Sequence, residues 1–180
     1  MSDPTGFEGG SALEAGGEMT IDHKDEPSQP TINGVRITQK LQIADERGSV
    51  MHMLRADAPE FIEFGEIYFS TVNPGFLKGW HLHHRMFLNY VCVQGEIALH
   101  LYDGRSDSST KGVQLSIELS PHKYFMVTVP PRVWNGFECI GDTTAIVANC
   151  ATEAHDPSEI VREDPWKSTL PHPWRAKKGF

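Results

Sequence analysis

The sequence predicts an all-β domain, either a barrel or a sandwich, on three observations. From Val35 onward, short apolar stretches rich in Val, Ile, Phe and Tyr alternate with Gly, Asp and Pro, as in strands joined by turns. The segment 94–96, Gln-Gly-Glu, separates two apolar runs in the manner of a hairpin turn. The segment 103–107 is a polar loop before the next apolar run, and many short strands with tight connections are typical of barrels and sandwiches.

The predicted strands follow one another along most of the chain. Most of them are followed within two residues by Gly, Pro, Asp or Ser, which favour turns or interrupt strand pairing. In chain order they span residues 35–43, 49–55, 65–72, 77–83, 87–93, 97–102, 113–119, 124–129, 134–140 and 144–151.

A change of pattern after the last strand predicts a short C-terminal helix. Asp156 precedes Pro157, and these residue types are preferred at the N-cap and the first position of a helix. Glu159 falls in the first turn, where the positive end of the helix dipole favours an acid. We expect this helix to close one end of the β domain.

The first 30 residues differ from the rest of the chain. They are rich in Gly, Ser, Glu, Asp and Pro and show no periodic apolar pattern, so they cannot offset the entropy lost on ordering. We expect residues 1–30 to form a flexible arm, or an arm that orders only against a partner subunit. Residues 31–180 are long enough for one domain with a sizeable core.

Charge and composition exclude several classes of partner. The net charge of −8 argues against general nucleic-acid binding, although a local basic pocket could still bind a small anionic ligand. No apolar run approaches the roughly 20 residues that span a bilayer, and no signal peptide opens the chain, so we expect a cytoplasmic protein without a membrane partner. The odd set of Cys92, Cys139 and Cys150 lacks metal-type spacing and predicts buried thiols.

Two histidines on one predicted strand are the strongest candidates for chemistry. In the stretch 78–84, Lys-Gly-Trp-His-Leu-His-His, strand alternation directs His81 and His83 to one face and His84 to the other. Two imidazoles would then share one pocket. An ordinary pKa of about 6.5 lets histidine transfer protons near neutral pH, and its neutral ring can also bind a metal.

Five stretches, taken together in order and spacing, resemble one known family. The chain is similar to the dTDP-4-dehydrorhamnose 3,5-epimerase family, whose fold is a cupin-type double-stranded β-helix, or jelly roll. The stretches that carry the resemblance are 45–48 (the family's D-x-R-G), 78–81 (its R-G-L-H), 103–112 (its D-x-R-x-x-S-x-T-x-G), 130–137 (its P-x-G-x-x-H-G-F) and 164–165 (its late D-D-P).

The resemblance implies a homodimeric enzyme that needs no cofactor and acts on a 4-keto-6-deoxy sugar linked to a nucleoside diphosphate. A histidine base removes a proton from the carbon next to the ketone, and a tyrosine returns one on the opposite face. By this correspondence His81 matches the base. Arg47 matches a residue that binds the diphosphate, for which a guanidinium fork is well suited.

Several positions depart from the family pattern. The lysine near the keto oxygen is replaced by Leu88, which stabilises no charge, and the arginine of the R-G-L-H motif becomes Lys78. Asn135 stands at the histidine of H-G-F, and the catalytic tyrosine falls near His155. We also expect no counterpart of the carboxylate that stands behind the base.

The pair His81-x-His83 favours a second assignment within the same fold. It is similar to the H-x-H of sugar-nucleotide 3,4-ketoisomerases, in which two histidines on one strand face could shuttle protons between adjacent carbons. Our hypothesis is therefore a sugar-nucleotide epimerase or isomerase with His81 as the base. His83 would be the second acid/base or a hydrogen-bond donor to the enolate.

Two other interpretations of the function stay open. A metal-dependent cupin is less favoured. Its motif has a Glu four or five residues after the histidine pair and a further His later in the chain, and this chain has Phe87, Leu88 and Asn135 at those positions. We therefore expect no metal site. A non-catalytic sugar or nucleotide-sugar binding cupin is the alternative that Leu88 and Asn135 support.

The remaining candidate residues each have a structural alternative. Tyr68 could replace the missing tyrosine as the acid, or it could pack in the core. Trp134 beside Asn135 could stack on a base or sugar, or it could fill the barrel. Asn89 could donate to a substrate oxygen, or it could face water. With Arg47, Lys78 and Asn135 these complete the predicted substrate-binding set.

Overall fold

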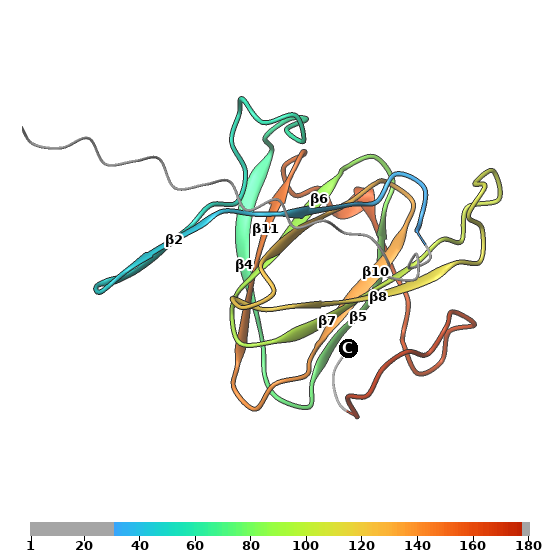
Figure 1. The fold of residues 1–180 in the computed structure, drawn as a ribbon. Helices are drawn as coiled ribbons and strands as arrows, with labels where there is room; N and C mark the ends of the chain where they lie inside the picture. The colour runs from blue at the N-terminus through green and yellow to red at the C-terminus, as the bar shows by residue number, and fades with distance from the viewer. Residues whose placement is uncertain (1–30, 178–180) are drawn as a thin grey trace, which may run out of the picture.

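The computed structural model describes residues 31–177, and two five-stranded antiparallel sheets face each other across their core (Figure 1). The predicted N-terminal arm, 1–30, lies outside the described residues. The all-β jelly roll predicted from the sequence is confirmed. In spatial order the first sheet holds β1 (Arg36–Gln39), β9 (Phe125–Val129), β6 (Leu88–Gln94), β11 (Ala145–Ala151) and β4 (Glu66–Val72), and the second holds β12 (Ile160–Arg162), β5 (Leu77–His83), β10 (Trp134–Cys139), β7 (Ile97–Tyr102) and β8 (Gln114–Leu119).

A separate hairpin projects from the barrel. It consists of β2 (Gln42–Asp45) and β3 (Gly48–Met51), shown in cyan and extending away from both sheets in Figure 1. The sequence predicted a single strand over 35–43, which was wrong. β1 pairs with β9 as far as Gln39, and the backbone N–H of Lys40 then donates to Tyr124 O, so the next residues are free to pair with β3 instead.

The C-terminal part differs from the prediction in two ways: the helix is shorter than expected, and an unexpected strand follows it. The helix is a single 3-10 turn, η1 (Pro157–Glu159), and the Asp156 side chain caps it by accepting from the backbone N–H of Ser158, as predicted. The three-residue strand β12 follows at once and pairs with β5. No helix in the described part of the chain is long and apolar enough to cross a membrane.

The core lies between the two sheets and is built from the inward faces of their strands. Leu88, Tyr90 and Cys92 alternate inward from β6, and Leu99 and Leu101 do so from β7. All three cysteines are buried free thiols, which confirms that part of the sequence prediction. The core therefore packs one face of each sheet and leaves the open end of the barrel for a cavity.

A second apolar cluster fixes the outer side of β5. Trp80 packs edge-on against Trp174 with ring centroids 4.9 Å apart, and its indole N–H donates to the carbonyl of Pro171. The C-terminal segment is held there by Glu138, whose buried carboxylate accepts from the backbone N–H groups of Arg175 and Ala176. Trp80 directly precedes His81 in β5, so this packing anchors the strand that carries both His81 and His83.

The approach of β10 to β5 requires a glycine at residue 136. The pairing shifts register between Asn135 and Phe137, and a Cβ at Gly136 would lie 2.8 Å from the carbonyl oxygens of Lys78 and Gly79. Backbone atoms cannot move aside as a flexible side chain can. Gly136 therefore sets the close spacing of the two strands beside the histidines.

Replacing Gly136 with alanine should destabilise the fold by about 1–3 kcal/mol, because the added methyl group overpacks two backbone carbonyls. The free energy of unfolding in urea measures this. Gly141→Ala is the matched control, since its added Cβ would meet Glu96 at an ordinary 3.4 Å and should cost less than about 0.5 kcal/mol. Equal losses in the two variants would contradict the close-approach explanation.

Candidate active site

An open cavity of about 610 Å³ lies between the two sheets. Side chains of β4 line it from the first sheet, and side chains of β5 line it from the second. The segment around η1 and β12 contributes His155, Ile160 and Arg162, and strands β6, β10 and β11 also contribute lining residues. Of the residues predicted from sequence, His81, His83, Tyr68 and Lys78 all line this cavity.

The predicted alternation of β5 is present in the structure. His81 and His83 both line the cavity, with ring centroids 5.7 Å apart and ring planes almost perpendicular. His84 is exposed, as a residue on the opposite face would be. The strand therefore gathers two imidazoles in one cavity, as the sequence predicted.

Both hydrogen-bond partners of the His81 ring are neutral groups. Its Nδ1 lies 3.2 Å from the carbonyl oxygen of Gly79, and its Nε2 lies 3.1 Å from the hydroxyl of Tyr90. Burial, with a smaller contribution from nearby His83, lowers the pKa of His81 to about 4. His81 is therefore uncharged at neutral pH, and both of its ring nitrogens have protein partners.

Tyr90 and Asn135 extend this neutral network. The Tyr90 hydroxyl donates to Asn135 Oδ1 at 3.0 Å, and Asn135 Nδ2 donates to the carbonyls of His81 and Val133. Burial raises the pKa of Tyr90 well above its ordinary value, so the phenol keeps its proton. When His81 donates from Nδ1 to Gly79, its Nε2 competes with Asn135 for the single Tyr90 hydrogen. Asn135 thus supports His81 from behind instead of facing the cavity.

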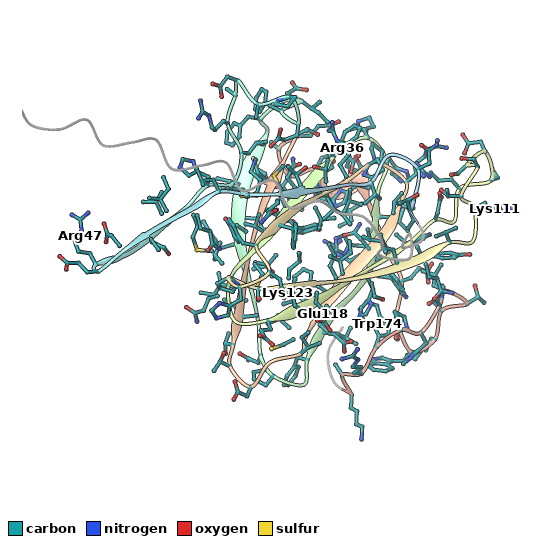
Figure 2. The ribbon with its side chains drawn as sticks, in the orientation of Figure 1. Arg36, Arg47, Lys111, Glu118, Lys123 and Trp174 are labelled. Atoms are coloured by element: carbon teal, nitrogen blue, oxygen red, sulfur yellow. The ribbon has the colours of Figure 1, made fainter. Side chains whose placement is uncertain are left out.

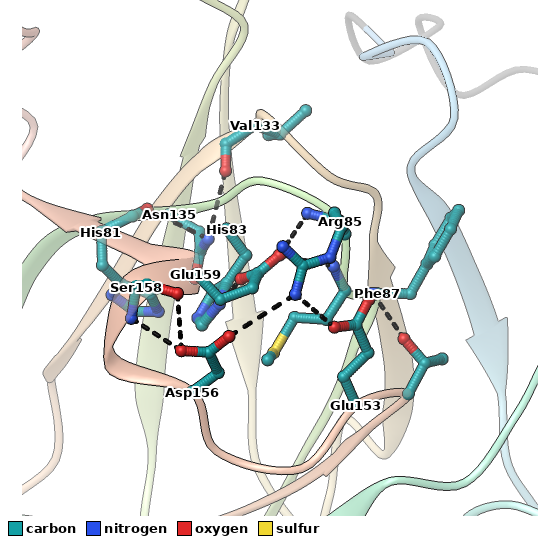
Figure 3. Close-up of polar contacts among 12 residues, drawn as sticks. His81, His83, Arg85, Phe87, Val133, Asn135, Glu153, Asp156, Ser158 and Glu159 are labelled. Carbon is teal, nitrogen blue, oxygen red and sulfur yellow. Dashed lines mark hydrogen bonds and ion pairs between the residues drawn. The ribbon is translucent and has the colours of Figure 1, made fainter.

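His83 has a charged partner. Its Nδ1 lies 2.7 Å from Oε2 of Glu159, a fully buried carboxylate (Figure 3). The other carboxylate oxygen of Glu159 accepts from the backbone N–H groups of Arg85 and Met86. Burial by itself would raise the pKa of Glu159, but these hydrogen bonds outweigh it and the pKa is lowered. Burial lowers the pKa of His83, and Glu159 opposes that shift.

Local structure explains how Glu159, which lies 76 positions after His83 in the sequence, reaches its ring. The Asp156 cap and Pro157 start the 3-10 turn that ends at Glu159, and β12 then pairs Ile160 with His83. The sequence predicted Glu159 in a helix but gave it no functional role. No local pattern signals the contact, because it depends on a three-residue strand pairing at long range.

Tyr68 faces the histidines from the other sheet. It comes from β4, lines the cavity and accepts a hydrogen bond from Asn149 Nδ2 at 2.8 Å. Burial raises the pKa of Tyr68, so the phenol keeps its proton at neutral pH. Its oxygen acts as the acceptor in that bond, which leaves its own hydrogen available to another group.

Two cationic side chains also line the cavity. Lys78 Nζ donates to the hydroxyl of Ser70, and burial lowers the pKa of Lys78. Arg162 of β12 lies opposite His81 in the strand register. Sequence reasoning missed Arg162, whose place in the cavity depends on the same short strand that brings Glu159 to His83.

Besides Asn135, three more predicted residues lie away from the cavity. The Asn89 amide donates to the carbonyl of Cys150 and accepts from Thr128, so it serves the pairing of β6 with its neighbours. Trp134 packs with the second apolar cluster. Arg47 lies at the tip of the β2–β3 hairpin (Figure 2), where its side chain is 84% exposed and pairs with Asp45.

Two of the family departures can be placed in the structure. Leu88 is fully buried in the core between the sheets. His155, at the position expected for the catalytic tyrosine, lies on the wall of the cavity. Within residues 31–177, no group of three or more His, Cys, Asp or Glu side chains is arranged to hold a metal ion.

Comparison with known proteins gives a consistent family. The family model described as dTDP-4-dehydrorhamnose 3,5-epimerase matches residues 29–171. Among curated proteins, the chain is 30% identical over 145 residues to the probable low-salt glycan biosynthesis epimerase Agl13 of Haloferax volcanii, covering 79% of this chain and 90% of that protein.

Solved structures agree with this match. A dTDP sugar isomerase from Desulfovibrio desulfuricans G20 is 41% identical, with a TM-score of 0.73 over 77% of this chain and 88% of its own. NovW, a 4-keto-6-deoxy sugar epimerase from Streptomyces spheroides, is 21% identical with a TM-score of 0.74 over 83% of this chain and 78% of its own, which shows the shared fold.

Replacing Tyr90 with phenylalanine should destabilise the protein by about 1–3 kcal/mol, because the buried Asn135 oxygen loses its donor. Urea denaturation measures the loss. Tyr124→Phe is the control, since the buried Tyr124 hydroxyl has no hydrogen-bond partner within residues 31–177 and its removal should cost less than about 0.5 kcal/mol. A Tyr90→Phe variant as stable as Tyr124→Phe would show that the network behind His81 contributes no stability.

Proposed function

Because the chain belongs to the dTDP-4-dehydrorhamnose 3,5-epimerase family, we propose that its cavity binds a 4-keto-6-deoxyhexose linked to a nucleoside diphosphate. The family model covers every strand of the jelly roll. The chain is a nucleotide-sugar epimerase or isomerase. We also propose which residues of the cavity transfer the protons.

Groups that can transfer protons lie on opposite walls of one cavity, and this arrangement supports the proposal most strongly. His81 and His83 come from β5 in the second sheet, and Tyr68 comes from β4 in the first. Epimerisation removes a proton from one face of a carbon and returns one to the other face. An imidazole on one side and a phenol on the other meet that requirement.

The reaction begins at the carbon next to the ketone. A histidine takes the proton, the electron pair of the C–H bond forms a carbon–carbon double bond, and the carbonyl electrons move to oxygen as an enolate. Lys78 and Arg162 are the cations that line the cavity, and positive charge near the enolate oxygen lowers the barrier. These two side chains compensate for Leu88, which replaces the family's lysine. Tyr68 then protonates the opposite face.

A 3,4-ketoisomerase reaction is the second candidate, and the histidine pair favours it. His81 and His83 lie on the same face of β5, with ring centroids 5.7 Å apart, so they could serve adjacent carbons from one side. That reaction needs no acid on the opposite wall. The fate of the sugar after proton removal therefore separates the two candidates.

A homodimer gives Arg47 and the projecting hairpin a role. Ile43 and Val50 of the hairpin, and Ile67 and Phe69 of edge strand β4, are each half exposed or more. Apolar exposure on this scale favours association with another surface. In a dimer that covers these residues, the hairpin of one copy could bring its Arg47 to the diphosphate in the other copy.

In D₂O, the wild-type protein should incorporate deuterium next to the ketone of dTDP-4-keto-6-deoxyglucose and release an epimerised sugar. Tyr68→Phe should slow release of the epimer by about 10²-fold or more while labelled, uninverted substrate still accumulates, because the base still exchanges its proton. Mass spectrometry and NMR of the sugar measure both outcomes.

Tyr124→Phe is the matched control and should leave both rates unchanged, because Tyr124 does not line the cavity and its hydroxyl has no hydrogen-bond partner within residues 31–177. No deuterium incorporation by the wild-type protein would contradict the proposed function. A labelled 3-keto product instead of an epimer would assign the ketoisomerase reaction. Undiminished epimer release by Tyr68→Phe would remove Tyr68 as the acid.

A further inference from the structure

The two histidines of the cavity differ in the groups that hold them. Both ring nitrogens of His81 lie within hydrogen-bond distance of neutral protein groups, the Gly79 carbonyl and the Tyr90 hydroxyl. His83 uses only Nδ1, which contacts the carboxylate of Glu159. Its Nε2 has no hydrogen bond to the described residues. Of the four ring nitrogens, His83 Nε2 is therefore the one left free on a side chain that lines the cavity.

We propose that His83, oriented by Glu159, is the base that removes the substrate proton, and that His81 remains a neutral hydrogen-bonding group beside it. This assignment rests on the proposed function, and it differs from the role that the family resemblance gives to His81. Glu159 acts as a positioning residue, since it touches His83 and not the substrate.

Glu159 fixes the tautomer of His83 that a base requires. The carboxylate of Glu159 only accepts hydrogen bonds, so the hydrogen of the neutral ring must be on Nδ1 and the lone pair must be on Nε2. A base needs that lone pair on the nitrogen that reaches the substrate. The same logic governs the histidine of serine hydrolases, where an acid behind the ring fixes the tautomer.

Glu159 also compensates for the charge that the base acquires. A histidine that takes a proton becomes a cation, and Glu159 lies against His83 to stabilise it. Tyr90 keeps its proton and gives His81 no such compensation. A proton on His81 would also be repelled by any positive charge on the neighbouring ring of His83. Protonation of His83 is therefore favoured over protonation of His81.

The carboxylate of Glu159 is held rigidly against His83. Glu159 is fully buried, and one of its oxygens is held by the backbone N–H groups of Arg85 and Met86, so the other oxygen is directed at His83 (Figure 3). The cap of η1 and the pairing of β12 with β5 fix the backbone on either side. A positioning group held at this many points loses little entropy when the base reacts.

The charged and titratable groups around His83 come from several elements. Glu159 belongs to η1, Arg162 belongs to β12, His155 precedes η1, and His81 shares β5. Glu159 favours the protonated form of His83, whereas Arg162 and His155 oppose it. These opposing influences suit a base that must both accept and release a proton.

The proton balance follows from this assignment. The C–H bond next to the ketone breaks, an N–H bond forms at His83 Nε2, and the electron pair passes into the enolate. In epimerisation the Tyr68 O–H bond then breaks as its proton adds to the opposite face. Each turnover leaves an imidazolium on His83 and a phenolate on Tyr68, and proton exchange with water restores both.

The test compares Glu159→Gln with Glu153→Gln in the full chain. The glutamine at 159 keeps acceptor capacity for the backbone but presents an amide hydrogen donor to His83, which would place the ring hydrogen on Nε2. Glu153 lies on the same segment, and its carboxylate contacts the Arg85 side chain instead. The readouts are the rate of deuterium incorporation into dTDP-4-keto-6-deoxyglucose and the Kd for dTDP, measured by calorimetry.

Glu159→Gln should slow deuterium incorporation by about 10²- to 10⁴-fold. The Kd for dTDP should change less than about threefold, and Glu153→Gln should match the wild-type protein in both readouts. A loss of exchange below about tenfold in a folded Glu159→Gln variant overturns the proposal. A wild-type protein that exchanges no deuterium rejects the proposed function itself, so the two failures are distinguishable.

A second variant decides the question if Glu159→Gln does not fold. His83→Ala leaves space for free imidazole, which can act as a base in place of the missing ring. Added imidazole should restore deuterium incorporation in this variant by at least about tenfold. A smaller restoration, while the variant still binds dTDP, would overturn the assignment of His83 as the base.

Discussion

The buried carboxylate of Glu159 is the interaction on which the rest of the site depends. Burying a charge is costly unless hydrogen bonds compensate for it, and Glu159 has three such partners. Two are backbone N–H groups of the turn that leads from β5 to β6, and the third is His83. One side chain thereby connects the histidine strand, the following turn and the C-terminal segment. The cavity takes its shape where these three parts meet.

The contrast between the two histidines follows from this arrangement. His83 has an anionic partner, whereas His81 has a phenol, an amide and a carbonyl. The same residue type on the same strand face thus acquires different properties from its neighbours alone. Under the proposed function, the site can then divide proton transfer and hydrogen bonding between two imidazoles.

Much of this site could be predicted from the sequence, and the rest could not for identifiable physical reasons. The period of a strand is sufficient to place His81 and His83 on one face, and a capping pattern is sufficient to place the turn at Pro157. β6 is apolar on both faces, so its alternation does not reveal that Tyr90 points inward and Asn89 points outward. Glu159 reaches His83, and Arg162 reaches the cavity, because a three-residue strand pairs with β5 at long range, and no local pattern encodes such a pairing.

The ionisation states of the two histidines test the central claim most directly. Long-range ¹H–¹⁵N correlation spectra of the protein labelled at histidine, recorded across a pH titration, report the tautomer and the pKa of each ring. The account predicts that neutral His83 carries its hydrogen on Nδ1 and becomes charged at a higher pH than His81, whose pKa is about 4. A His81 ring that becomes charged at a higher pH than His83, or a neutral His83 with its hydrogen on Nε2, would contradict it.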